Sequence, residues 1–108
     1  MSQTPIFVFM MNTTLQLKDN AQNQRFELPV GEGLAFLSYR WQNGRLALMH
    51  TEVPESAEGK GIAKELVKFA FETAKQQQRQ VLVYCPYVST FLKRHPEYEY
   101  LVEKDYNS

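Results

Sequence analysis

The stretch Val53-Pro54-Glu55-Ser56-Ala57-Glu58-Gly59-Lys60-Gly61-Ile62-Ala63 decides the fold of this chain. It joins a strand-like segment to a helix-like segment through a proline-marked loop and the sequence Gly-Lys-Gly. A junction of this kind leaves backbone N–H groups unbonded at the positive end of a helix dipole. Glycines also let the backbone come close to an anion. The stretch therefore predicts a phosphate-binding loop.

Two common phosphate-binding motifs do not fit this stretch. A Walker A loop needs a glycine, four further residues and then Gly-Lys-Ser/Thr. Pro54 stands at the position of its first glycine, and Gly61 stands where it needs a hydroxyl. The dinucleotide fingerprint Gly-x-Gly-x-x-Gly needs a small third residue, and that residue is Lys64 here. The loop therefore belongs to neither class.

The segment before the loop has the pattern of antiparallel strands. Apolar and polar residues alternate over 34–41, and Asn43-Gly44 is a hairpin signal. The apolar run that follows this signal is the expected partner strand. A shorter strand is expected at 25–30, where Pro29 stops it.

From Gly61 the apolar period changes from two to 3.6 residues, which predicts a helix that fades near 76–78. The expected buried face of this helix carries Ile62, Leu66, Phe69, Ala70 and Thr73, and Ala63, Val67 and Ala74 widen it. A buried strand is expected at 81–84 and a short helix at 88–94. Strand, helix and strand in this order predict a βαβ unit with a parallel pair. The fold class is therefore α/β, in the mixed α+β sense, with antiparallel strands leading into one βαβ unit.

Four blocks then occur in order along the chain: His50-Thr51-x-Val53, Gly59-x-Gly61-Ile62-Ala63, Cys85-Pro86-Tyr87-Val88 and His95-Pro96-Glu97-Tyr98. The loop resembles the pyrophosphate loop Gln/Arg-x-x-Gly-x-Gly/Ala of the GNAT-type N-acetyltransferases, with the sequence Ser56-Ala57-Glu58-Gly59-Lys60-Gly61 here. The four blocks extend this resemblance along the chain. From about residue 26 to about residue 102 the chain is similar to the compact, stand-alone branch of that superfamily. It departs from the motif at Ser56, which replaces a long Gln or Arg, and at Glu58, which adds a negative charge.

The resemblance implies an abbreviated GNAT-like fold in which the βαβ unit forms a crevice for coenzyme A. It implies a GNAT-like N-acetyltransferase domain at 13–108, with 1–12 as an N-terminal extension or an edge strand. The implied cofactor is acetyl-coenzyme A (acetyl-CoA), which acts as acyl donor. The residues implied in cofactor binding follow the strand end and the loop: Thr51, Val53, Glu58, Gly59, Lys60, Gly61, Ile62, Ala63 and Lys64.

Two residues are candidates for catalysis. Cys85 follows the second strand of the βαβ unit, and the carboxyl ends of such strands line a crevice. Its thiol is a candidate carrier of the acetyl group or a proton donor to the departing thiolate, and a small buried hydrophobic residue is the alternative. His50 is a candidate general base or an activator of Cys85, and a histidine satisfied by hydrogen bonds at the sheet end is the alternative. His95 is expected to be structural.

Composition narrows the function classes. The chain has 108 residues, enough for one domain with a buried core, and a formal net charge of zero. A neutral chain is not expected to bind nucleic acid or an anionic membrane. The apolar run at 6–11 is too short to span a bilayer. A single cysteine excludes an intrachain disulfide and favours the cytoplasm, and one cysteine with two separate histidines makes no metal site.

The function implied by the resemblance is transfer of an acetyl group from acetyl-CoA to an unidentified amine. The short fold leaves the acceptor side open, which favours an amine on a protein or peptide. The alternatives are a non-catalytic module that binds coenzyme A, acyl-CoA or a protein partner, and a structural domain with an empty crevice. The expected oligomeric state is a monomer or a weak homodimer, because a trimmed sheet edge invites pairing.

Overall fold

The computed structural model describes residues 16–103, which are built around a five-stranded sheet. The expected extension at 1–12 lies outside the described residues. The strands follow one another across the sheet in chain order, and only β4 and β5 are parallel. Their bounds are β1 Lys18–Asn20, β2 Arg25–Val30, β3 Gly33–Gln42, β4 Arg45–Glu52 and β5 Val81–Val83.

The antiparallel part is built around the β3–β4 hairpin, as the sequence predicts. Asn43 and Gly44 form its two-residue turn, with φ angles of 53° and 80°. Positive φ at both positions is the turn geometry that matches the twist of paired strands. On β3, Ala35, Leu37 and Tyr39 are buried and their neighbours are more exposed, so the alternating pattern marks one buried face.

The expected strand end at Pro29 is wrong. β2 continues to Val30, and Pro29 pairs with Leu34 of β3. β1 pairs only with residues 25–27, so at Pro29 the strand β2 has β3 as its only neighbour in the described sheet. A proline, which has no N–H to donate, is tolerated at such an edge position.

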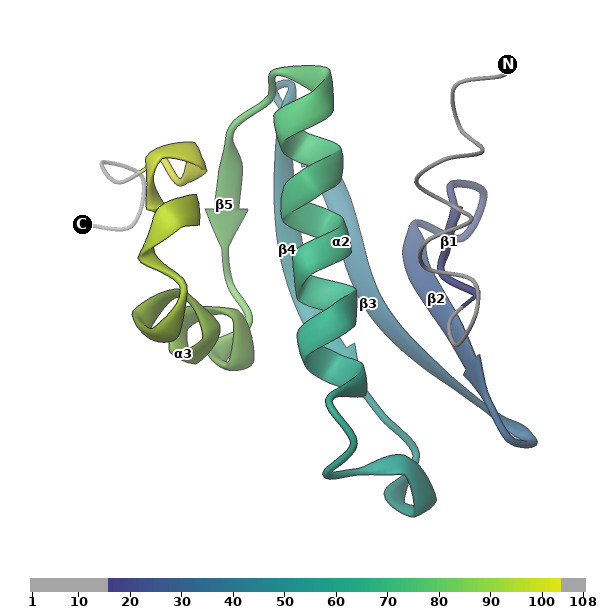
Figure 1. Ribbon diagram of the computed structural model, residues 1–108. Coiled ribbons are helices and arrows are strands. Elements are labelled where there is room, and N and C mark those ends of the chain that lie inside the picture. The colour runs from purple at the N-terminus through teal and green to yellow at the C-terminus, as the bar shows by residue number, and fades with distance from the viewer. Residues whose placement is uncertain (1–15, 104–108) are drawn as a thin grey trace.

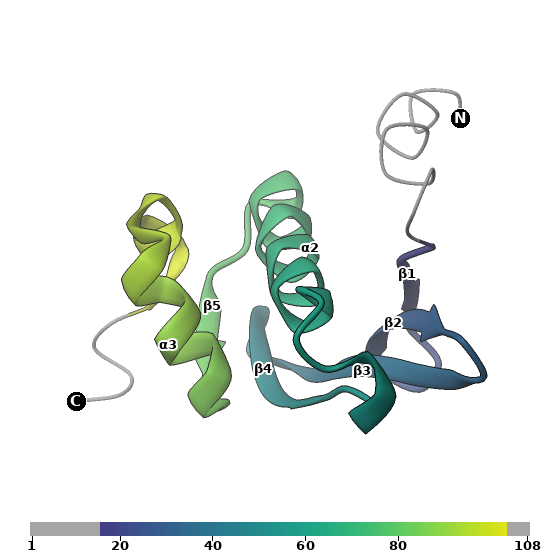
Figure 2. The ribbon, with the colours of Figure 1, turned by 60° about the horizontal axis from the view of Figure 1, so that its bottom comes forward.

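The helix α2 (Ile62–Gln77) links β4 to β5 and covers one face of the sheet (Figure 1, Figure 2). A short 3-10 helix, η1 (Glu55–Ala57), precedes it. β4 and β5 pair in parallel from Leu46↔Val81 to Leu48↔Val83, so the expected βαβ unit is confirmed. The connection from β4 to α2 lies at the same end of the sheet as the β2–β3 turn (Figure 1).

The buried face of α2 includes four of the predicted residues, Leu66, Val67, Ala70 and Ala74, and adds Phe71, which the sequence pattern does not predict. The other residues of the expected face, Ile62, Ala63, Phe69 and Thr73, are only half-buried. The face shifts toward Phe71 because this helix packs against later elements of the chain as well as against the sheet.

Two elements beside α2 supply the partners of Phe71. The helix α3 (Pro86–Arg94) carries Phe91, and the 3-10 helix η2 (Pro96–Leu101) carries Tyr98. The ring centroids of Phe91 and Tyr98 lie 6.0 and 5.2 Å from that of Phe71, with all three rings stacked. Stacked aromatic rings add to the stability that their buried area provides. This cluster therefore ties α2, α3 and η2 into one layer.

The outer edge of β5 is covered by the end of the described chain. Val102 forms a parallel bridge with Val81, and the Glu103 N–H donates to the Val81 carbonyl at 3.0 Å. The Glu103 carboxylate also pairs with the guanidinium of Arg45 at the start of β4. Part of this sheet edge is therefore occupied within the chain itself.

Tyr98→Phe is expected to lower the free energy of unfolding by about 1 kcal/mol. The Tyr98 hydroxyl donates a 2.7 Å hydrogen bond to Glu72 Oε2, and its residue is buried. Burial, followed by the Glu72 carboxylate, raises the pKa of Tyr98, so the hydroxyl remains a donor at neutral pH. Urea unfolding measures the effect. Tyr100→Phe is the matched control because Tyr100 is 64% exposed. Equal losses in both variants would contradict this assignment.

Candidate functional site

The loop between β4 and α2 has two residues in the left-handed region. Gly59 has φ of 83°, and Gly61, the N-cap of α2, has φ of 77°. An L side chain is strained at such angles, which explains glycine at both positions. Apart from chain neighbours, no atom lies within 4 Å of a Cβ built at either position. The backbone here therefore borders open space.

The amides of this loop are unpaired. Among the described residues, the N–H groups of 59–64 have no hydrogen-bond acceptor. The first bond of α2 runs from the Glu65 N–H to the Gly61 carbonyl at 3.1 Å. Glu58 differs from the others, because its N–H already donates to the Glu55 carbonyl at 3.2 Å. Six free amides at the positive end of a 16-residue helix have the arrangement that suits an anion.

Contacts with β3 fix the position of this loop. Pro54 lies against Gly33, where a built Cβ would be only 2.9 Å from Pro54 Cγ. A larger residue at position 33 would therefore push the loop away. Ala57 is the buried residue of η1, whereas Ser56 and Glu58, the two departures from the resembled motif, are exposed.

A bulge in β4 decides which side chains face the helices. Tyr39 pairs with Leu48, but the preceding residue, Ser38, pairs with His50. Met49 therefore has no partner on β3. Because side chains alternate along a strand, one extra residue reverses the faces of the residues that follow it.

Beyond the bulge, Thr51 faces the helices and His50 faces the opposite side. Thr51 pairs with the fully buried Leu37, and its Oγ1 lies 3.3 Å from Cys85 Sγ. The His50 ring lies 6.4 Å from that of Phe36 on the other face. The two candidate catalytic residues, His50 and Cys85, are therefore separated by the sheet.

β4 and β5 separate next to Thr51. Their ladder ends at Leu48, whose carbonyl accepts a 3.0 Å hydrogen bond from the Tyr84 N–H. β4 continues to Glu52 beside β3, while the chain turns from β5 into α3. Within the described residues, the side of β4 toward β5 is thus unpaired after Leu48. Two residues predicted to bind the cofactor, Thr51 and Val53, lie in or directly after this segment.

Cys85 lies where the two strands separate. The residue is 3% exposed and belongs to the hydrophobic core cluster. It is also the N-cap of α3, and its carbonyl accepts hydrogen bonds from the N–H groups of Val88 and Ser89 at 3.0 and 3.3 Å. The thiol is therefore held in place, with Thr51 as its polar neighbour.

His50, the second candidate catalytic residue, is exposed. Its side chain is 64% exposed, and its Nε2 lies 3.2 Å from Glu52 Oε1. The Ser38 hydroxyl donates to the His50 carbonyl at 3.3 Å. An imidazole beside a carboxylate can take a proton from a group that approaches from this face.

Tyr87 lies in the first turn of α3, two residues after Cys85, and is 38% exposed. Burial raises the pKa of its hydroxyl, with a lowering by the Arg94 charge and a further rise from the nearby Cys85. A tyrosine with a raised pKa remains a proton donor at neutral pH. Tyr87 belongs to the Cys-Pro-Tyr-Val block, but its spacing alone gives no signal of a proton donor beside a thiol.

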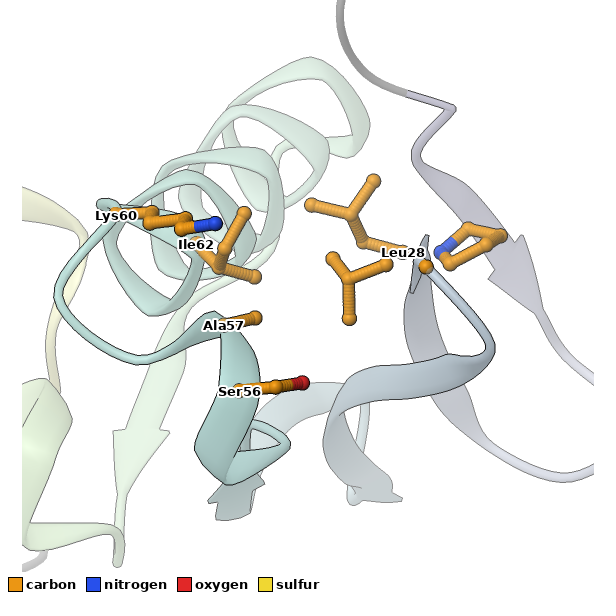
Figure 3. Close-up of a pocket in the computed structure, with 8 residues that line it drawn as sticks. Leu28, Ser56, Ala57, Lys60 and Ile62 are labelled. Atoms are coloured by element: carbon orange, nitrogen blue, oxygen red, sulfur yellow. The ribbon is translucent and has the colours of Figure 1, made fainter.

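The other predicted binding residues surround the N-terminus of α2. Ile62 and Ala63 are half-buried, so their amides are the groups that they offer. Lys64 is exposed and adds a positive charge to the first turn. Lys60 is also exposed, but its side chain lines a pocket on the β2 side of the loop (Figure 3).

Residues 16–103 contain no group of three or more His, Cys, Asp or Glu side chains able to hold a metal ion. None of the described helices has the length and apolar composition needed to cross a bilayer. The polar groups around this junction are the backbone amides of 59–64, the Cys85 thiol on the helix face and the His50 imidazole on the opposite face.

A comparison with family models decides the assignment of this architecture. The model of the GCN5-related N-acetyl-transferase family matches residues 25–101. The chain belongs to the GCN5-related N-acetyltransferase family. The match includes the loop, the bulged strand β4 and the helix α3, so the resemblance carried by the four sequence blocks is confirmed.

Several known proteins share sequence with the chain. Protein NATD1 of Danio rerio is 29% identical over 99 residues, which cover 89% of this chain and 90% of that protein. Protein NATD1 of Mus musculus is 28% identical over 101 residues, with coverage of 91% and 92%. Protein NATD1 of Bos taurus is 38% identical over 68 residues, and this match spans only 62% of the chain and 60% of that protein.

A solved structure shows the same architecture. The solution NMR structure of a GCN5-like protein from Staphylococcus aureus superposes with a TM-score of 0.66. The superposition covers 84% of this chain and 90% of that chain, at 23% sequence identity. A likeness at this identity shows the fold. The expected GNAT-like fold, with antiparallel strands and then a parallel pair, is therefore confirmed.

Proposed function

We propose that this protein binds acetyl-CoA at the β4–α2 loop and transfers the acetyl group to an amine. The run of six unpaired amides at 59–64, in a chain of the GCN5-related family, carries this proposal. A pyrophosphate suits such a site because the N–H groups and the helix dipole act on it together. Gly59 and Gly61, which both have positive φ, carry no side chains, so the backbone there can come close to the pyrophosphate.

The strand end β4 completes the donor site in this proposal. The pantetheine arm pairs with the side of β4 that is free after Leu48, along Thr51 and Val53. Lys64 adds positive charge beside the phosphates. Glu58 lies at the rim, and its amide does not contribute because it is bonded within η1. The donor, when bound, supplies a thioester whose acetyl carbon is open to attack.

The proposed reaction needs two proton transfers, one from the attacking amine and one to the departing thiolate. On the face without α2, His50 takes a proton from the attacking amine, and Glu52 at 3.2 Å stabilises the charged ring. Tyr87, at the start of α3, donates a proton to the departing coenzyme A thiolate. The amine nitrogen forms its bond to the acetyl carbon as the carbon–sulfur bond breaks. Direct transfer of this kind conserves charge and needs no covalent enzyme intermediate.

Burial favours the direct route over an acetyl-Cys85 intermediate. A nucleophilic thiol must be ionised and must reach the acetyl carbon. Cys85 is 3% exposed, and its polar neighbour among the described residues is Thr51. His50, the candidate activator, lies on the opposite face of the sheet.

The acceptor side favours a large acceptor. No described helix covers the face of the sheet that carries His50 (Figure 2). The described chain therefore forms no enclosed chamber over His50 that would select a small metabolite. An amine on a protein or peptide can approach from this side.

A second candidate function is binding of coenzyme A or acyl-CoA without turnover. The burial of Cys85 and the position of His50 on the opposite face of the sheet favour this function, because the thiol and the imidazole do not form an activated pair. In that case the loop serves as a binding module for an acyl carrier, and the open face serves a protein partner.

Acetyl transfer by the wild type distinguishes the enzyme from the binding module. Two variants then distinguish direct transfer from an acetyl-Cys85 intermediate. Acetyl transfer is measured on peptides that contain N-terminal and lysine amines. We expect His50→Gln to lower kcat/KM by about 100-fold, as is typical for loss of a general base, and Cys85→Ala to lower it by less than about tenfold. His95→Gln is the matched control, because that ring stacks on Phe91 with centroids 4.3 Å apart and His95 is expected to be structural.

Two other outcomes would contradict direct transfer. A larger loss in Cys85→Ala than in His50→Gln, with acetyl-Cys85 detected by mass spectrometry, would establish the covalent route instead. Acetyl-CoA binding without transfer to any amine would establish the binding module and reject the enzyme.

A further inference from the structure

A pocket of about 360 Å³ lies between the β2–β3 turn and the start of α2 (Figure 3). Its walls come from β2, from the turn after β2, from η1 and from the beginning of α2. No described residue of β4, β5 or α3 lines it. The proposed coenzyme A crevice lies between β4 and β5, so the pocket is a separate cavity on the other side of the loop.

The pocket combines apolar walls with two polar groups at its rim. The apolar walls come from Leu28, Val30, Ala57 and Ile62. The polar groups are the hydroxyl of Ser56 and the ammonium of Lys60. In Figure 3 the Ser56 hydroxyl points toward the cavity, and the Lys60 amine lies beside Ile62. Both polar groups thus stand next to apolar surface.

Lys60 is the charged residue among those that line this pocket. Lys60 takes part in none of the ion pairs among residues 16–103. A cationic ligand would be repelled by Lys60. A phosphate would leave the apolar walls uncovered. A carboxylate with a hydrocarbon body suits both the charge and the apolar walls. Its negative end pairs with Lys60, and its body displaces water from the walls.

We propose that this pocket binds a small monocarboxylate with a compact apolar body. Its carboxylate pairs with the Lys60 ammonium and accepts a hydrogen bond from the Ser56 hydroxyl. The volume lies at the lower end of the range for ligand pockets, about 300–1,000 Å³. A branched aliphatic or single-ring acid fits that size better than a drug-sized molecule. The pocket shares Lys60 and Ile62 with the β4–α2 loop, but its ligand contacts their side chains, whereas the proposed pyrophosphate contacts their backbone amides.

Isocaproate and its uncharged amide, isocaproamide, are suitable probes because they have the same branched body. Each is titrated into isotope-labelled full-length protein without coenzyme A, and the backbone amide NMR signals are followed. We expect isocaproate to shift the signals of Gly31, Ala57 and Ile62 and to leave those of the β3–β4 hairpin unchanged. Isocaproamide is expected to bind about tenfold more weakly, because it lacks one charge-assisted hydrogen bond.

Lys60→Met tests the charged contact directly, because it removes the ammonium and keeps an apolar stem. We expect this variant to bind isocaproate about tenfold more weakly and to bind isocaproamide as the wild type does. Lys75→Met is the matched control, because Lys75 is exposed in the last turn of α2, the helix that follows Lys60.

Three results would overturn the inference: no shift at the pocket residues, equal isocaproate affinity in the two lysine variants, or displacement of isocaproate by coenzyme A. The last result would make the pocket part of the coenzyme A site. Isocaproate binding in a protein that does not bind acetyl-CoA would support the inference while rejecting the proposed function, so the two proposals fail separately.

Discussion

Gly59→Glu and Gly61→Glu are each expected to lower the affinity for acetyl-CoA by at least about 100-fold, or about 3 kcal/mol. Both residues have positive φ, at 83° and 77°, where a side chain adds about 1–2 kcal/mol of strain. The new carboxylate also places a negative charge beside the amides proposed to hold the pyrophosphate. Isothermal calorimetry of wild type and both variants measures the loss.

Gly44→Glu is the matched control for these two variants. Gly44 also has positive φ, at 80°, but it lies in the β3–β4 hairpin near Arg79, at the opposite end of α2. The substitution introduces the same charge with a comparable backbone strain, far from the loop. We expect it to leave acetyl-CoA affinity within about twofold of wild type. Equal losses at all three glycines would mean that general destabilisation, rather than the loop, explains the effect.

Phe71→Ala is expected to lower the free energy of unfolding by about 3–5 kcal/mol, the largest stability effect that we predict. Phe71 is fully buried, and its ring stacks on those of Phe91 and Tyr98. Truncation removes this apolar contact and leaves a cavity where α2, α3 and η2 meet. Urea unfolding at equilibrium measures the change.

Phe36→Ala is the control for the loss of an aromatic ring. Phe36 is half-buried on the face without α2, where the guanidinium of Arg25 lies 4.9 Å from its ring centroid. We expect its truncation to lower the free energy of unfolding by less than half as much. A similar loss in both variants would contradict the central place given to the Phe71 cluster.

The sequence predicts the parts of this fold that depend on local chemistry. Asn43-Gly44 adopts the two positive φ angles of a tight hairpin because those residue types tolerate them. The change of apolar period at Gly61 marks the start of α2 because a helix buries every third or fourth residue. Gly59 and Gly61 indicate a loop in the sequence because glycine tolerates the positive φ angles that both residues adopt.

The features that the sequence does not reveal depend on contacts between distant segments. The bulge at Met49 follows from the register between β3 and β4, and it places Thr51 rather than His50 beside Cys85. Phe71 is buried because α3 and η2 close over it, and neither element is part of the helix pattern. No residue pattern along the strand or the helix carries this information.

The side of the loop that Lys60 faces is also set by tertiary structure. A lysine between two glycines predicts a charge for the phosphates, yet its side chain lines the pocket beside β2. Pro29 shows the same dependence, because the strand passes through it only where β1 no longer pairs. The binding roles predicted for the loop residues remain proposals that ligand titrations can decide.

The central claim, that the amides of residues 59–64 hold acetyl-CoA, is tested most directly by titrating acetyl-CoA into isotope-labelled wild-type protein. We predict the largest changes of backbone amide NMR signals at 59–64, smaller changes on β4 after Leu48, and none in the β3–β4 hairpin. Signals of 59–64 that stay in place at saturating acetyl-CoA would contradict the claim.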